Sequence, residues 1–186
     1  MWLLSIGLIL FLLPHLLREL GLREPLRARL PSDAAYKGLY SLTALAGLAL
    51  IIVGKASAPF LMIWQPAFEL RYISLLLMIP AVVLVLLGSL PASHLQRALR
   101  HPMLLGVLLW GIAHLWSNGD LASLLLFGSF TVWAAFKFVM LTFTTTPSPR
   151  QPSLLWDFTA VLAGLLSYVI ISLFHGQLFG VGLNFV

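Results

Sequence analysis

The sequence predicts an all-α bundle of about six helices that cross a membrane. Hydrophobic residues make up 60% of the 186 residues and charged residues only 9%, whereas charged residues form about a quarter of an ordinary soluble domain. Mean hydropathy is +1.00. Six apolar stretches follow one another, each close to the length of about 20 residues that a helix needs to cross a bilayer. Because lipid offers the backbone no hydrogen bonds, each stretch should be helical.

The six predicted spans fill most of the chain, and the first and fourth are short. They cover 2–17, 36–54, 73–91, 102–117, 121–143 and 154–174. Nine basic residues lie in or beside the first, third and fifth connections: Arg18, Arg23, Arg27, Arg29, Lys37, Arg97, Arg100, Lys137 and Arg150. Only Lys55 and Arg71 lie on the other side. Basic residues favour the cytoplasm, so both termini are predicted to lie outside. Residues 1–186 are interpreted as one transmembrane domain.

The composition excludes several classes of function. The chain has no cysteine, which excludes disulfides, cysteine-ligated iron-sulfur clusters and covalently attached haem. It has no carboxylate pair, no nucleophile beside a base and no glycine-rich phosphate loop, so hydrolase and nucleotide-dependent activities have no support. The net charge of +5 lies in short connections, where it favours anionic lipid over nucleic acid as the partner.

The most informative stretch runs from Arg100 to Leu121. Pro102 should start a helix, because the first helical position has no hydrogen bond for proline to lose. The sequence at 117–120, Ser-Asn-Gly-Asp, predicts a turn whose last residue caps the next helix. Within the helix, Gly106, Trp110 and His114 are spaced four residues apart, so a small residue, an aromatic ring and an imidazole share one stripe. Such a stripe can face a planar ligand.

The first span repeats this spacing with Gly7, Phe11 and His15. Two helices that each offer an imidazole beside an aromatic ring suit a non-covalent b-type haem with axial ligands His15 and His114. Depth is an objection, because upright helices would place these two Cα atoms roughly 15 Å apart along the membrane normal. By depth alone, His15 pairs better with His101, and His114 pairs better with His175.

Charged residues near the cytoplasmic side allow further interpretations. The first connection should form a short interfacial helix that anchors the chain on anionic lipid. Alternatively, Arg18 or Arg23 binds a carboxylate or phosphate of the cofactor. Lys137 and Asp157 are the ionisable residues nearest membrane depth, and they can pair across helices or form a proton relay.

Three stretches resemble the NnrU family of bacterial inner-membrane proteins, and the resemblance covers nearly the whole chain. They are HPMLLGVLLWGIAHLWSNGDLASLLLFGS at 101–129, YKGLYSLTALAGLALIIVG at 36–54 and IWQP at 63–66. The family is associated with denitrification and nitric oxide metabolism. It is similar to the plant 15-cis-zeta-carotene isomerase, which binds b-type haem through histidines that fall on His15 and His114. The resemblance therefore implies a haem protein of the bacterial inner membrane, acting in nitric oxide or redox metabolism or isomerising a hydrophobic polyene.

Two other interpretations stay open. In the first, the protein carries no cofactor and assists a respiratory or denitrification membrane complex, and its histidines only hydrogen-bond between helices. In the second, Arg100, His101, Pro102 and Gly106 resemble the methyl-donor site of membrane methyltransferases of the isoprenylcysteine carboxyl type, which use S-adenosylmethionine. Leu104 stands where that motif has tyrosine, and no matching partner segment follows the fifth span.

Overall fold

The computed structural model describes residues 1–67, 70–146 and 150–183, and they form an all-α bundle. The helices are α1 (Trp2–Leu12), the 3-10 turn η1 (Pro14–Leu16), α2 (Arg23–Ala28), α3 (Asp33–Ala56), α4 (Arg71–Ser89), α5 (His94–Leu99), α6 (Pro102–Ser117), α7 (Leu121–Thr144) and α8 (Leu154–Phe179). Four of them, α3, α4, α7 and α8, are long and apolar enough to cross a membrane, while α1 and α6 are apolar but shorter. The predicted fold class of a membrane helical bundle is confirmed.

The helix ends follow local capping chemistry. Helix α3 begins before the predicted span because the hydroxyl of Ser32 accepts a hydrogen bond from the amide of Ala35 at 3.1 Å. Pro102 is the first residue of α6, and Asp120 caps α7 by accepting from the amide of Ser123 at 2.9 Å, so both predicted signals are confirmed. Helix α8 runs five residues past the predicted span to Phe179, and its cap is Gly180, whose φ of +74° suits glycine.

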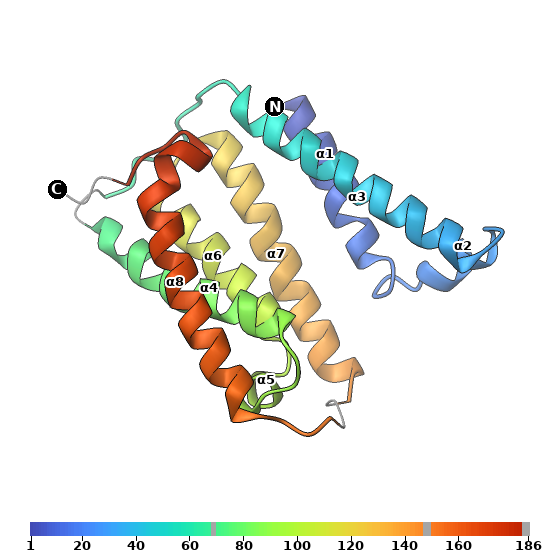
Figure 1. Ribbon diagram of the computed structural model, residues 1–186. Helices are drawn as coiled ribbons and strands as arrows, with labels where there is room; N and C mark the ends of the chain where they lie inside the picture. Colours follow the sequence, from blue (N-terminus) through green and yellow to red (C-terminus); the bar gives the residue numbers. More distant parts are fainter. Residues whose placement is uncertain (68–69, 147–149, 184–186) are drawn as a thin grey trace.

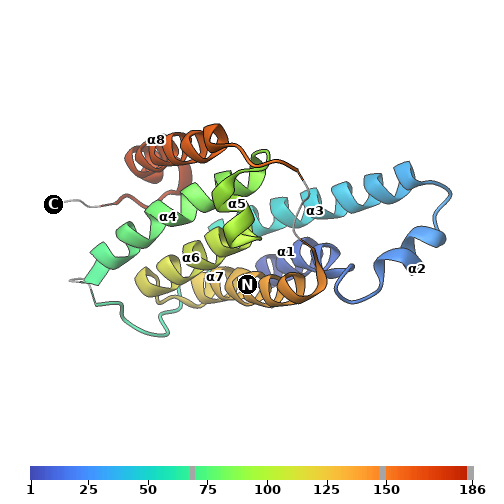
Figure 2. The same ribbon diagram turned by 90° about the horizontal axis from the view of Figure 1, so that it is seen from below.

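Helix α7 joins two groups of helices (Figure 1). In one group α1 packs along α3, and in the other α4 packs between α6 and α8, while α7 contacts α6, α1 and α3. Figure 2 shows α8 on the side of α4 that faces away from α6. Glycines allow the closest approaches: a Cβ on Gly47 would lie 2.6 Å from the amide nitrogen of Phe11, so no larger residue fits between α1 and α3 without a shift.

The bundle has two chemically different ends. Short helices α2 and α5 lie at one end, which carries the nine basic residues of the alternate connections and is called the basic end below (Figure 1). The N-terminus and the carboxyl end of α8 both lie at the opposite end. Between the ends, large apolar side chains point outward, among them Val132, Phe143 and Phe158, which are 70%, 84% and 71% exposed. Such a surface is suited to lipid.

Buried charges tie the helices together, and one predicted contact is wrong. Lys137 does not pair with Asp157. It forms an ion pair with Glu19 at 3.1 Å and also donates to the backbone carbonyl of His15. Asp157 instead accepts from the amides of His94 and Leu95, both at 3.0 Å, and so caps α5. The polar groups at membrane depth therefore serve as helix-to-helix ties.

Candidate functional site

His15 lies at the end of the first helix, on the side facing α7. Pro14 has no amide hydrogen with which to continue the α-helical ladder, and the chain tightens into η1. The Nδ1 atom of His15 donates to the carbonyl of Phe11 at 2.6 Å. Around the imidazole lie the rings of Phe11, Tyr40 and Trp133, with centroids at 4.7, 5.3 and 6.1 Å. Because a carbonyl only accepts, Nδ1 carries a proton, and in the neutral imidazole Nε2 then keeps its lone pair.

His114 lies near the end of α6 and has the same backbone arrangement. Its Nδ1 atom donates to the carbonyl of Trp110, one turn earlier, at 2.8 Å. The imidazole stacks on Phe127 of α7 with a centroid distance of 4.4 Å and an interplanar angle of 25°. Nε2 of His114 therefore also keeps its lone pair. Both histidines are held by a carbonyl of their own helix, which is how many metal-binding imidazoles are oriented.

Three aromatic side chains connect the two imidazoles, and we call them the aromatic bridge: Phe11, Phe130 and Trp110. From His15 the ring contacts run through Phe11, Phe130 and Trp110 to His114, with successive centroid distances of 4.7, 5.7, 5.6 and 5.2 Å. Along α7, the imidazoles lie beside Trp133 and Phe127. Six residues of helix separate these positions, which corresponds to about 9 Å.

The two glycines of the predicted stripes face other helices. A Cβ on Gly7 would lie 2.6 Å from the amide nitrogen of Ile51 in α3, and a Cβ on Gly106 would lie 2.7 Å from the carbonyl oxygen of Ala81 in α4. Both glycines therefore allow close helix packing, and a ligand contact for either one stays a prediction. Phe11 and Trp110 do point toward the aromatic bridge, together with the histidine four residues after each.

The alternative ligands have different surroundings. His101 lies at the basic end, where its Nε2 atom is 3.3 Å from the hydroxyl of Thr145. Burial lowers its pKa, outweighing a hydrogen bond to the backbone of Leu141 that raises it. His175 is half-buried and its Nδ1 donates to the carbonyl of Val181 at 2.5 Å. The pairing of His114 with His175 stays a prediction.

The Arg-His-Pro segment joins α6 to the end of α7. Arg100 donates to the carbonyl of Thr145 at 2.6 Å, and it has a positive φ of 62°, which is uncommon for a residue other than glycine. His101 contacts the hydroxyl of the same threonine. Both side chains of the methyltransferase-like motif are therefore engaged in contacts within the bundle.

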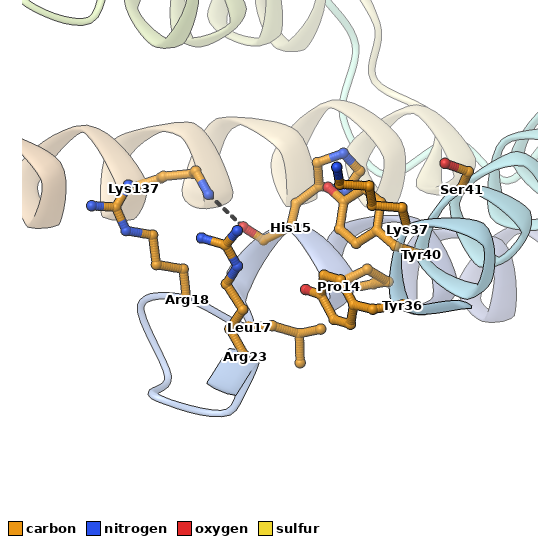
Figure 3. A pocket seen from close by; sticks show the side chains of 10 residues that line it. All are labelled: Pro14, His15, Leu17, Arg18, Arg23, Tyr36, Lys37, Tyr40, Ser41 and Lys137. Atoms are coloured by element: carbon orange, nitrogen blue, oxygen red, sulfur yellow. Dashed lines mark hydrogen bonds between the residues drawn. The ribbon is translucent and has the colours of Figure 1, made fainter. Parts of the chain in front are cut away.

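Arg18 lies with His15 beside a pocket at the basic end (Figure 3).

The sequence interpretation missed the contribution of α7, which supplies Phe127, Phe130, Trp133 and Lys137. These four residues are spaced three or four apart, so they lie along one side of a helix. Their spacing in the sequence could have shown that these four residues share one side of a helix. It could not have shown which other helices that side contacts.

The donors of this site suit a haem, but the present arrangement of its aromatic rings does not. The donors suit an axial ligand set, because each imidazole is oriented by a carbonyl and offers Nε2. Between the imidazoles, however, the aromatic bridge occupies the space. A planar macrocycle therefore fits only if Phe11, Phe130 and Trp110 turn aside or the pair of α1 and α3 shifts relative to α6. Among the described residues, no group of three or more His, Asp and Glu is placed to hold a metal ion directly.

The fold and the site define an all-helical membrane protein with two imidazoles facing a shared aromatic core. Comparison with protein families identifies it further. The family model described as NnrU protein matches residues 3–183, and the chain therefore belongs to the NnrU family. No curated protein matches the chain, and neither does any solved structure.

Proposed function

We propose that this member of the NnrU family is a b-type haem protein of the bacterial inner membrane, with His15 and His114 as the axial ligands. The orientation of the two imidazoles carries the proposal. In each, Nδ1 donates to the carbonyl four residues earlier, at 2.6 Å in one and 2.8 Å in the other. Nε2 is left as the metal-binding atom, and both rings contact the aromatic bridge.

His15 and His114 suit this role better than the other histidines do. His101 has its Nε2 atom beside the hydroxyl of Thr145, at 3.3 Å. Both candidate ligands contact the aromatic bridge, whereas His101 contacts Phe138 of α7 and His94 is exposed in α5. A haem needs only one or two protein ligands, and an apolar surrounding then controls water access and redox potential.

The chain would bind and enclose the cofactor with few polar groups. His15 and His114 would hold the iron, while the rings of the aromatic bridge would turn aside and exclude water. A bound haem supplies a redox-active or Lewis-acidic iron, which suits a role in nitric oxide or redox metabolism or the isomerisation of a polyene lipid. A hydrophobic substrate would enter from the bilayer, because the outer surface of the bundle is apolar.

The distribution of basic residues sets the orientation in this proposal. The basic end faces the cytoplasm, and both termini lie on the outer side of the inner membrane. His15 is then near the cytoplasmic side and His114 nearer the outer side.

An absorption spectrum tests the proposal directly. The protein is expressed with haem supply, purified in detergent, and measured in the oxidised and dithionite-reduced forms beside His15→Ala and His114→Ala. The matched control is His94→Ala, which removes an exposed imidazole. We expect a low-spin spectrum with sharp reduced bands in the wild type and the control, and its loss in both ligand variants.

Other results assign the histidines differently or overturn the proposal. His175→Ala is measured as well. If the low-spin spectrum is lost in His114→Ala and in His175→Ala but persists in His15→Ala, His175 rather than His15 is the second ligand. A colourless wild-type protein with full haem supply would overturn haem binding. The cofactor-free interpretation would then apply, and purification of the intact membrane complex would identify the respiratory or denitrification partner.

A further inference from the structure

A pocket of about 310 Å³ opens at the basic end, between η1, the beginning of α3, and α7 (Figure 3). Ten residues line it: Pro14, His15, Leu17, Arg18, Arg23, Tyr36, Lys37, Tyr40, Ser41 and Lys137. Its volume is at the lower end of the range of about 300–1,000 Å³ that is typical of small-molecule sites.

The lining of this pocket is strongly positive. Four of its residues are cations and none is a carboxylate. Glu19 pairs with Lys137 at 3.1 Å and Glu24 with Arg23 at 3.9 Å, but neither glutamate lines the pocket. Within the part of the chain that the structure describes, Arg18 forms no ion pair and no side-chain hydrogen bond. The pocket therefore has more positive charge than the protein itself neutralises.

The donors come from three directions, as recognition of a tetrahedral anion requires. Arg18 and Arg23 both line the pocket from the first connection. Figure 3 shows the guanidinium group of Arg23 near the ammonium group of Lys137, whereas the side chain of Arg18 extends away from that ammonium group. Lys137 is held in place by Glu19 and by the carbonyl of His15, and only 18% of its side chain is exposed. Guanidinium and ammonium groups together form strong charge-assisted bonds to phosphate.

Helix α3 contributes hydroxyl groups and an apolar track. Tyr36, Tyr40 and Ser41 offer uncharged donors in the same pocket. Continuing from Ser41 at helical spacing, Leu45 and Leu48 lie one and two turns deeper and are 62% and 41% exposed. A ligand with a phosphate group in the pocket can therefore lay a hydrocarbon chain along α3.

We propose that this pocket binds the phosphate group of an anionic glycerophospholipid. Basic pockets between membrane helices recognise such headgroups, and the exposed leucines of α3 favour a lipid over a soluble phosphate. The proposal does not depend on haem binding. The lipid would bridge η1, α3 and α7, the three elements that surround His15.

Native mass spectrometry of the full chain, purified without haem supply and stripped of lipid, tests this proposal. Phosphatidylglycerol and phosphatidylcholine with the same acyl chains are added in turn to wild type, Arg18→Gln and Arg29→Gln. Arg18 makes no contact whose loss would unfold the protein, and Arg29 is an exposed arginine of the same connection outside the pocket. We expect wild type and Arg29→Gln to prefer phosphatidylglycerol, and Arg18→Gln to bind it about fivefold more weakly.

Three results would overturn the lipid site. One is equal binding of the two lipids, and another is equal weakening by Arg18→Gln and Arg29→Gln. The third is binding of inorganic phosphate alone that depends on Arg18 and displaces phosphatidylglycerol, which would assign the pocket to a soluble phosphate. Arg18→Lys, which keeps the charge, should restore most of the preference and separates charge from shape.

Discussion

Replacing Gly47 by alanine tests whether the close contact of α1 and α3 positions the first candidate ligand. A Cβ at this site would lie 2.6 Å from the amide nitrogen of Phe11 and 2.9 Å from the carbonyl carbon of Leu10, whereas ordinary contact begins at 3.4 Å. Both atoms belong to the backbone, so no side chain can rotate to make room. The helices must separate locally by about 0.8 Å.

The expected cost follows from overpacking at a backbone contact. Forcing one extra carbon into a tightly packed interior costs about 1–3 kcal/mol. For a protein of this size each kcal/mol lowers the melting temperature by about 2–4 °C, so Gly47→Ala should lower it by about 2–12 °C. Gly38→Ala is the matched control on the same helix, since a Cβ there meets nothing within 4 Å. Alanine should stabilise the helix at that position by about 0.5–1 kcal/mol.

Thermal unfolding in detergent, followed by far-ultraviolet circular dichroism, measures both variants. A second assay uses the haem-loaded protein, because the carbonyl of Phe11 holds Nδ1 of His15 at 2.6 Å. A displaced Phe11 should reduce the low-spin fraction of the spectrum in Gly47→Ala and leave it unchanged in Gly38→Ala. Equal melting temperatures for the two variants would refute the packing argument, whatever the spectrum shows.

Three further predictions follow from the charged residues. Burial raises the pKa of Asp120, but hydrogen bonds from Ser123 and Lys55 outweigh it and hold the pKa below its usual value. The stabilisation is fully present above about pH 5 and is lost as the pH falls. Wild type should therefore lose more thermal stability than Asp120→Asn between about pH 6 and pH 3. Lys137→Met leaves Glu19 buried without its partner and should cost about 3–5 kcal/mol in unfolding experiments, most of which the double variant with Glu19→Leu recovers. A periplasmic reporter enzyme should be active when fused to the C-terminus and inactive when inserted in the connection before α3; the reverse pattern would contradict the orientation.

Much of the fold could be predicted because each helix is encoded locally. Apolar stretches bounded by Pro102, by the turn at 117–120 and by Ser32 produce helices close to the predicted spans. Which helices pack together could not be predicted. Helical spacing defines a face, but its partner depends on how the shapes of segments distant in the chain complement each other. The packing of Gly47 against the backbone of Phe11 depends on such complementary shapes. The position of α7 between the two groups of helices depends on them as well.

The candidate site was predictable in part, and helix geometry explains the limit. Residues four apart are displaced by about 40° around the helix, so a stripe of three such residues turns by about 80° from one end to the other. Gly106 therefore contacts α4, while His114 in the same stripe contacts Phe127 of α7. Gly7 faces α3 alone, whereas His15 lies between Tyr40 of α3 and Trp133 of α7. The spacing identified the imidazoles and the neighbouring aromatic rings, but not the surroundings of the glycines.

The buried pair of Lys137 and Glu19 relates this geometry to function. Only 18% and 3% of these side chains are exposed, and moving two charges out of water costs more free energy than many such pairs return. Such a pair can be retained despite this cost because it fixes the relative position of two helices. Lys137 bonds both Glu19 and the carbonyl of His15. The pair therefore fixes the end of the first helix at the position of Lys137 along the axis of α7. Because His114 stacks on Phe127 of the same helix, this pair sets the separation of the two imidazoles.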